Sequence, residues 1–175
     1  MVNAGAEVVG ATLGNDVNLR DIEGRSALLL GKAKDNNASC AIGPFVRLFD
    51  ASFTLDHVRQ ADVSLTIVGE DGFMLNEVSP MNMISRDVLD LVAQTINESH
   101  QYPDGLALFT GTLFAPSQDR GDTGQGFTHK IGDVVSIRAS KLGTLQNRVT
   151  YCDQAPPWEF GISSLMKNLS QRGLL

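Results

Sequence analysis

The chain has 175 residues, of which 42% are hydrophobic and 19% charged, a composition typical of a folded protein that buries a core without needing disulfides or a structural metal. Its net charge of −6, with no cluster of basic residues, disfavours nucleic-acid binding. Its apolar runs are far shorter than the roughly 20 residues that span a bilayer, and its first residues do not form a secretory signal, so we expect a cytoplasmic protein with no membrane partner.

The first quarter of the chain mixes a strand pattern with an irregular helical one. Residues 6–13 predict a short strand that ends in a turn-prone cluster. Residues 19–30 predict a helix, interrupted by Gly24 and closed by Gly31. Residues 39–49 predict a strand broken at Gly43-Pro44, because a proline within a strand indicates an edge, a bulge or a crossing between sheets.

The middle of the chain has the clearest periodicity. Residues 62–68 alternate apolar and polar side chains, which predicts a strand, and the turn at 69–72 leads into a second strand at 73–78. A helix is expected after Ser85, the candidate N-cap. Its apolar stripe consists of Val88, Leu91, Val92, Thr95 and Ile96.

The last third of the chain again favours strands. Residues 105–114 predict a strand leading into a polar loop with three glycines, which must be exposed or line a site. Residues 133–139 and 145–151 predict a hairpin, and an amphipathic helix follows Trp158. Strands outnumber helices, so we expect a mainly β fold with peripheral helices (α+β), a mixed or antiparallel sheet sandwich, in a single domain.

Several segments carry groups that could do chemistry. Residues 15–23 concentrate oxygen ligands of the kind that hard divalent cations prefer, although the segment equally fits a capped helix entry with solvated charges. It is not an EF-hand, because Asp21 stands where that loop needs glycine. Lys34 could stabilise a developing negative charge, although a solvated lysine pair with Lys32 is the plainer interpretation. The glycine of the Thr110-Gly111-Thr112 step would let a ligand approach the backbone closely.

Other common sites are not supported by the spacing of the residues. The three histidines lie in separate segments without a zinc motif, and the glycine-rich stretch 121–126 lacks the lysine of a phosphate-binding loop. The two cysteines, Cys40 and Cys152, are expected to be free and inert rather than nucleophilic.

Taken in order, four motifs resemble the catalytic domain of the fumarylacetoacetate hydrolase family. They are GNDVNLRDIE at 14–23, KAKDNNASCAIGP at 32–44, the GT pair at 111–112, and the GDxV and LGxLxNxV strands of a closing hairpin at 132–149. The stretch around Lys34 is most similar to the branch that dehydrates 2-keto-3-deoxy sugar acids.

The resemblance implies a mixed β-sandwich roll, usually a homodimer, that acts as a metal-dependent dehydratase or hydrolase on a small 2-keto acid such as a 2-keto-3-deoxy sugar acid or an acylpyruvate. It implies Mg²⁺, or Mn²⁺ or Ca²⁺ in its place, as a Lewis acid. By the same resemblance Asp16 is a metal ligand, and Lys34 and Thr112 are catalytic. Arg20, Glu23 and Gly111 would bind substrate; Glu23 stands where fumarylacetoacetate hydrolase itself has glutamine.

The sequence departs from the family pattern at one point. The family's Glu-x-Glu pair of metal ligands has no counterpart between Met1 and Asp16, where Glu7 stands by itself. By the family's order the pair would precede Met1, so we expect residues 1–175 to be an N-terminally truncated C-terminal catalytic domain that binds metal weakly. The alternative is a catalytically inactive fragment or assembly module that lacks the complete metal site.

Overall fold

The computed structural model of the protein describes residues 1–124 and 126–175. They form two compact units, the first made of Met1–Asn15 and Ala41–Val149, the second of Asp16–Cys40 and Thr150–Leu175. In the described part the elements are, in chain order, β1 (Gly10–Asp16), α1 (Arg20–Glu23), the 3₁₀ helix η1 (Ala27–Leu29), α2 (Leu30–Lys34), β2 (Cys40–Leu48), α3 (Leu55–Arg59), β3 (Asp62–Val68), β4 (Met74–Pro80), the 3₁₀ helix η2 (Met81–Met83), α4 (Val88–Thr95), β5 (Val134–Ala139), β6 (Gly143–Arg148) and α5 (Ile162–Gln171). The mainly β fold with peripheral helices is therefore confirmed.

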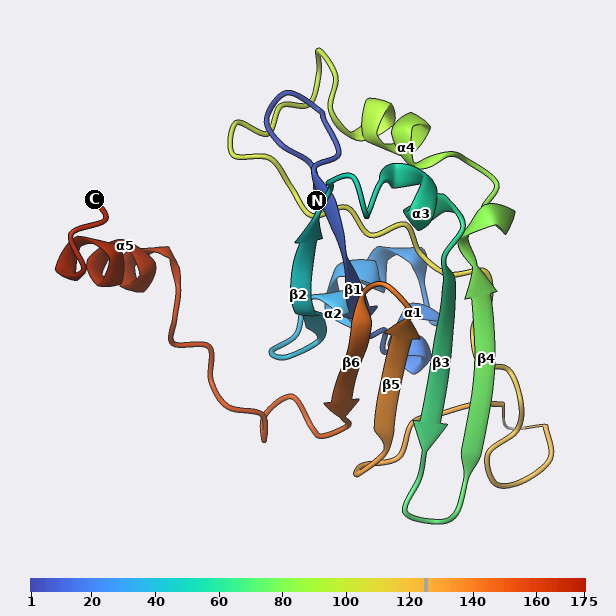
Figure 1. Ribbon diagram of the computed structural model, residues 1–175. Coiled ribbons are helices and arrows are strands. Elements are labelled where there is room, and N and C mark those ends of the chain that lie inside the picture. The colour runs from blue at the N-terminus through green and yellow to red at the C-terminus, as the bar shows by residue number, and fades with distance from the viewer. Residues whose placement is uncertain (125) are drawn as a thin grey trace. The chain divides into compact units, whose positions relative to one another are not determined.

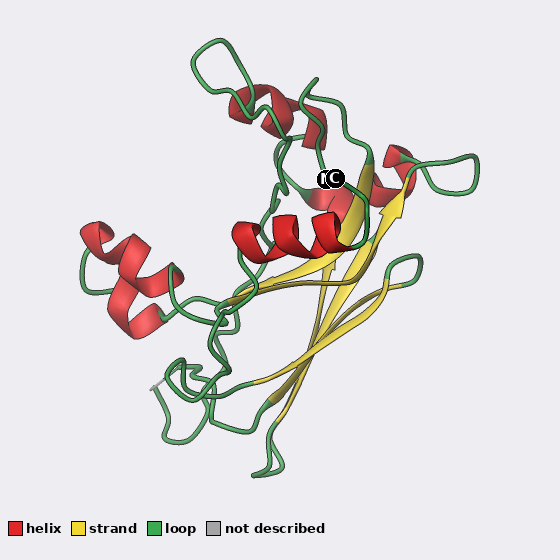
Figure 2. Ribbon diagram, turned by 90° about the vertical axis from the view of Figure 1, so that its left-hand side faces the viewer, coloured by secondary structure: helices red, strands yellow, loops and turns green. Residues whose placement is uncertain are grey.

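A four-stranded antiparallel sheet in the order β4-β3-β5-β6 dominates the first unit (Figure 1). Its strands cross at an angle when seen from the side, which is the normal twist of a sheet (Figure 2). Ile67 on β3 lies opposite Leu75 on β4 and Val135 on β5, and these three residues are buried together with Phe127. The alternation over 62–68 thus places one face of the sheet against a core, as predicted.

A second sheet of two strands, β1 and β2, covers another core cluster of the first unit. Leu13 of β1 packs with Phe53 and with side chains of the β5–β6 hairpin. Pro44 lies within β2 without breaking it, because β2 has a strand partner on one side and can accommodate a residue that has no N–H on the other. Of the edge, bulge or crossing between sheets that this proline left open, the structure shows an edge strand, whereas the expected break is wrong. The buried members of the cluster are Leu13, Phe53, Ala139, Leu142 and Leu145.

The helix predicted after Ser85 is α4, but it begins two residues later than expected. Asp87 is its N-cap, and its side chain accepts a hydrogen bond of 2.9 Å from the Leu89 N–H. The guanidinium of Arg59 on α3 holds the same carboxylate through its Nε at 2.7 Å. Asp87 therefore takes the role proposed for Ser85, since a carboxylate both caps the first turn and pairs with Arg59.

The strand predicted over 105–114 is wrong. Within that segment only Leu106 forms a β-bridge, with Val2. Farther along, the Leu113 N–H donates to the Ser79 hydroxyl at 3.1 Å instead of to a strand carbonyl. The apolar composition reflected partial burial, but a strand also needs a neighbouring strand with unpaired backbone groups. No helix among the described residues is long and apolar enough to cross a membrane.

Candidate functional site

The second unit contains four of the six residues that the sequence singled out, and its backbone pairing brings their segments together. The Val17 N–H donates to the Ser39 carbonyl at 2.9 Å, and the Leu19 N–H to the Ala33 carbonyl at 3.1 Å. The chain leaving β1 at Asp16 therefore runs beside the segment that ends α2 and leads to β2.

The helix predicted over 19–30 is divided into three short pieces. Gly24 ends α1, and the Ser26 hydroxyl caps η1 by accepting from the Leu28 N–H at 3.2 Å. The helix α2 then continues through Gly31, so the predicted closure at that glycine is wrong. Extending the helix past Gly31 allows Lys34 to stand at the end of α2.

Asp16 and Lys34 form an ion pair with 2.7 Å between Lys34 Nζ and Asp16 Oδ2. Ala33, fully buried, anchors α2, and the Ser39 hydroxyl donates to the Lys34 carbonyl at 2.6 Å. The two side chains are 44% and 33% exposed, so the pair contributes only about 0–1 kcal/mol to stability. The structure thus joins the predicted metal ligand to the predicted catalytic lysine in a place open to a ligand.

Arg20 and Glu23 are the first and last residues of α1. The Glu23 side chain is half-buried, and its Oε2 accepts a hydrogen bond from the Asn18 side-chain amide. Asn18 was not among the site residues predicted from the sequence, although its neighbours Asp16 and Arg20 were.

Gly111 and Thr112 belong to the first unit, in a segment with neither helix nor strand. Both residues are exposed, and Gly111 has a φ of +76°, a conformation that glycine adopts without strain. Their part in the site stays a prediction.

The described residues do not form a complete cation site. Among them there is no group of three or more His, Cys, Asp or Glu side chains placed to hold a metal ion. Asp16 is a single carboxylate, and Lys34 already occupies its Oδ2. Mg²⁺ prefers near-octahedral coordination by oxygen, so the donors of this chain do not by themselves fit the ion.

Cys40 is the first residue of β2. Its thiol is free, and so is the thiol of Cys152. Partial burial and the nearby Asp16 carboxylate raise the pKa of the Cys40 thiol, although Lys34 opposes the shift. A raised pKa lowers the fraction of thiolate at neutral pH, which supports the expectation that this cysteine is not a nucleophile.

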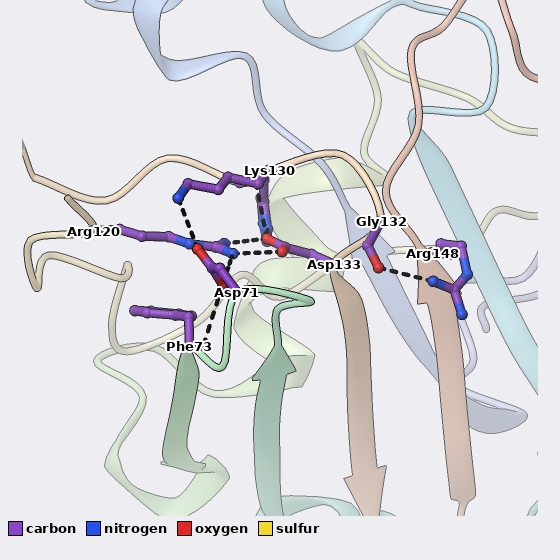
Figure 3. Close-up of polar contacts among 8 residues, drawn as sticks. Asp71, Phe73, Arg120, Lys130, Gly132, Asp133 and Arg148 are labelled. Carbon is purple, nitrogen blue, oxygen red and sulfur yellow. Dashed lines mark hydrogen bonds and ion pairs between the residues drawn. The ribbon is translucent and has the colours of Figure 1, made fainter.

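A buried charged network in the first unit was missed by the sequence reasoning (Figure 3). Arg120, from the polar loop, donates through both terminal nitrogens to the carboxylate of Asp133, and their side chains are 2% and 1% exposed. Arg120 Nη2 also reaches Asp71 Oδ1 at 3.1 Å, while Lys130 Nζ lies 2.7 Å from Asp71 Oδ2. The loop was expected to be exposed or to line a site; most of its described residues are exposed, and its arginine fastens it to the sheet.

The surroundings of Arg120 explain why it can lie buried. Its guanidinium lies 4.4 Å from the centroid of the Phe73 ring, and a Cβ at Gly69 would lie 2.4 Å from its Nη2. Although burial opposes it, hydrogen bonds from Arg120 and the Lys130 N–H lower the pKa of Asp133. The turn glycine was a visible signal, but only the fold shows that it makes room for a guanidinium.

A known protein family matches most of the chain. The model of the fumarylacetoacetate hydrolase C-terminal family matches residues 2–150. The chain belongs to this family. The resemblance read from the four motifs is thereby confirmed.

Two curated relatives are described as dehydratases, one of them as a probable one. A protein of Haloferax volcanii described as a probable 2-keto-3-deoxyxylonate dehydratase is 31% identical over 144 residues, which is 82% of this chain and 46% of that protein. The 2-dehydro-3-deoxy-D-arabinonate dehydratase of Saccharolobus solfataricus is 28% identical, over 83% of this chain and 45% of that protein. The chain thus spans about half the length of the curated relatives it matches.

Solved structures of the family show the same fold. A 2-keto-3-deoxy-D-arabinonate dehydratase in its apo form matches with a TM-score of 0.71 at 27% identity, over 85% of this chain and 49% of that one. The same kind of enzyme complexed with magnesium and 2,5-dioxopentanoate matches with a TM-score of 0.69 at 28% identity, with the same coverage. Magnesium and a keto acid are thus found together in a solved relative.

Proposed function

We propose that this chain carries part of the active site of a dehydratase that acts on a 2-keto-3-deoxy sugar acid. The observation that carries the proposal is the Asp16–Lys34 pair, in a chain that is 31% identical to a dehydratase of such acids. Hydrolysis of an acylpyruvate, the other reaction implied by the family resemblance, has less support because both curated relatives are dehydratases.

Dehydration of such an acid requires negative charge to be stabilised. A base takes the proton from the carbon beside the ketone, and the electron pair of that C–H bond forms a C=C bond to the next carbon. The hydroxyl group on that carbon takes up a proton and leaves as water. Charge develops on the ketone oxygen as the proton leaves carbon. The Lys34 ammonium would donate a hydrogen bond to that oxygen, while Asp16 keeps the ammonium in place.

The remaining predicted residues would hold the substrate. The Arg20 guanidinium suits a carboxylate, and the Glu23 carboxylate suits a hydroxyl. Thr112 and Gly111, which the family resemblance assigns to catalysis and to substrate binding, lie in the first unit, and their part in the reaction stays a prediction.

Mg²⁺ enters the proposal only as an ion for which this chain supplies one ligand, Asp16. When bound in the family's enzymes it would polarise the keto acid as a Lewis acid. The described residues hold no complete donor set for the ion.

Calorimetric titration tests the proposal. In buffer containing Mg²⁺, the chain is expected to bind 2-dehydro-3-deoxy-D-arabinonate, and Lys34→Ala to weaken binding about tenfold, because a charged hydrogen bond is lost. Lys32→Ala is the matched control, since this exposed lysine lies on the same helix. No binding by the unsubstituted chain, or equal weakening by both variants, would contradict the proposal.

A second candidate is an assembly module without turnover of its own. It is favoured by the lack, among the described residues, of a group of three metal-ligating side chains. Release of 2,5-dioxopentanoate from 2-dehydro-3-deoxy-D-arabinonate by the isolated chain would exclude this candidate.

A further inference from the structure

Among the described residues, Asn18 is the one whose side chain donates a hydrogen bond to the Glu23 carboxylate. Its Nδ2 donates to Glu23 Oε2, and within the described part of the chain Oε1 accepts no hydrogen bond. A half-buried carboxylate needs hydrogen-bond donors. The bond to Oε2 therefore fixes the orientation of the Glu23 carboxylate, and Oε1 is left to accept a hydrogen bond from a ligand.

The orientation of the Asn18 amide follows from its partner. An ionised carboxylate only accepts hydrogen bonds, so the nitrogen of the amide must face Glu23. The Asn18 Oδ1 atom then lies buried, with no donor from the described residues. A buried acceptor without a partner is unfavourable for folding, so stability does not explain why an amide stands here.

The backbone alone does not orient Glu23. The Glu23 N–H donates to the Leu19 carbonyl at 3.0 Å, which places its Cα at the end of a single helical turn. Its side chain has three further rotatable bonds, and among the described residues Asn18 is what holds them. The other acidic residue of the turn, Asp21, lies 3.6 Å from Arg25 and is mostly exposed.

We propose that Asn18 is a positioning residue for substrate selection. It holds Glu23 through Oε2 so that Oε1 accepts a hydrogen bond from a hydroxyl of the substrate's carbon chain. The pair would therefore favour hydroxylated 2-keto acids over 2-keto acids of the same length that lack hydroxyls. This inference rests on the proposed function.

The test compares two acids of equal chain length, 2-dehydro-3-deoxy-D-arabinonate and 2-oxopentanoate, by calorimetry in buffer with Mg²⁺. The unsubstituted chain is expected to prefer the hydroxylated acid. Asn18→Asp, which has the same shape but no donor, should reduce that preference about tenfold and leave the affinity for 2-oxopentanoate nearly unchanged. Asn168→Asp adds the same charge on α5 and is the control.

A double variant separates positioning from a general loss of structure. Combining Asn18→Asp with Glu23→Gln restores the hydrogen bond with donor and acceptor exchanged, so part of the preference should return. Equal weakening of both acids by Asn18→Asp, or no recovery in the double variant, overturns the inference. Equal binding of both acids by the unsubstituted chain overturns it while leaving the proposed function intact, whereas binding of neither acid removes both.

Discussion

Lys34 and Asp16 form an ion pair whose side chains are 33% and 44% exposed, whereas those of Arg120 and Asp133 are 2% and 1% exposed. Solvent screens the first pair, which therefore remains available to a ligand at little cost in stability. Arg120 and Asp133 are shielded from solvent, so water cannot replace either side chain as the partner of the other. Burial thus separates a candidate catalytic pair from a structural one that uses the same kinds of charge.

Removing Arg120 should be costly. Arg120→Met leaves Asp133 as a buried, uncompensated carboxylate, which destabilises a protein by about 3 kcal/mol or more. The denaturation midpoint in urea checks this, with Arg148→Met as control because Arg148 is exposed and its nearest carboxylate, on Glu70, lies 3.5 Å away. Similar midpoints for the two variants would contradict a buried clamp.

The same variant should alter the response to acid. The pKa of Asp133 is lowered in the folded chain, so its stabilising contribution is present above the unfolded pKa of about 3.9 and lost as pH falls through the folded pKa. In Arg120→Met the arginine no longer lowers the pKa of Asp133, whereas burial still raises it. The free energy of unfolding should therefore fall less steeply between about pH 5 and about pH 3 than in the unsubstituted chain.

Among the elements, the contact between β1 and β2 depends on a glycine. A Cβ at Gly10 would lie 2.4 Å from the backbone carbonyl oxygen of Arg47, which side-chain rotation cannot relieve. The two strands therefore approach each other at a distance that only glycine allows at this position.

Substitution of glycine by alanine should have opposite effects on stability at Gly10, where the strands approach closely, and at Gly31, where there is space. Gly10→Ala should lower the free energy of unfolding by about 1–3 kcal/mol, because the backbone must shift. Gly31→Ala, in α2 with nothing within 4 Å of the added Cβ, should raise it by up to about 1 kcal/mol through helix propensity. Urea denaturation of both variants checks this, and a destabilised Gly31→Ala would show that α2 does not tolerate a side chain there.

The element that the sequence predicted best is one whose pattern is also its packing. β3 begins and ends where the alternation does, and Ile67 on its apolar face is buried in the core. By contrast, 105–114 is as apolar as a strand but has no strand to pair with over most of its length. Periodicity reports burial of one face, whereas hydrogen-bond partners come from elsewhere in the chain.

At the scale of the whole molecule, the donor set of the described residues is incomplete and predicts weak binding of Mg²⁺. One carboxylate, already paired with Lys34, should give a dissociation constant in the millimolar range or weaker, because affinity depends on the number and geometry of oxygen ligands. Calorimetric titration with MgCl₂ measures it, with Asp16→Asn as the comparison. Micromolar binding that survives Asp16→Asn would mean that other groups hold the ion.

The sequence by itself determined the family and the mainly β character, because ordered motifs and local alternation are properties of neighbouring residues. It also singled out Asp16, Lys34, Arg20 and Glu23 as site residues, and their roles stay predictions. It also predicted the residues at 111–112, whose role is still a proposal.

Only the tertiary structure showed which charges meet. Arg120 and Asp133 are 13 residues apart and Asp71 is 49 residues from Arg120, so no local pattern connects them. Asn18 came to notice in the same way, through the hydrogen bond that its side chain makes with Glu23. The sequence alone does not show whether a charged or amide side chain is solvated, structural or placed for a ligand. Its burial and the position of its partner decide this.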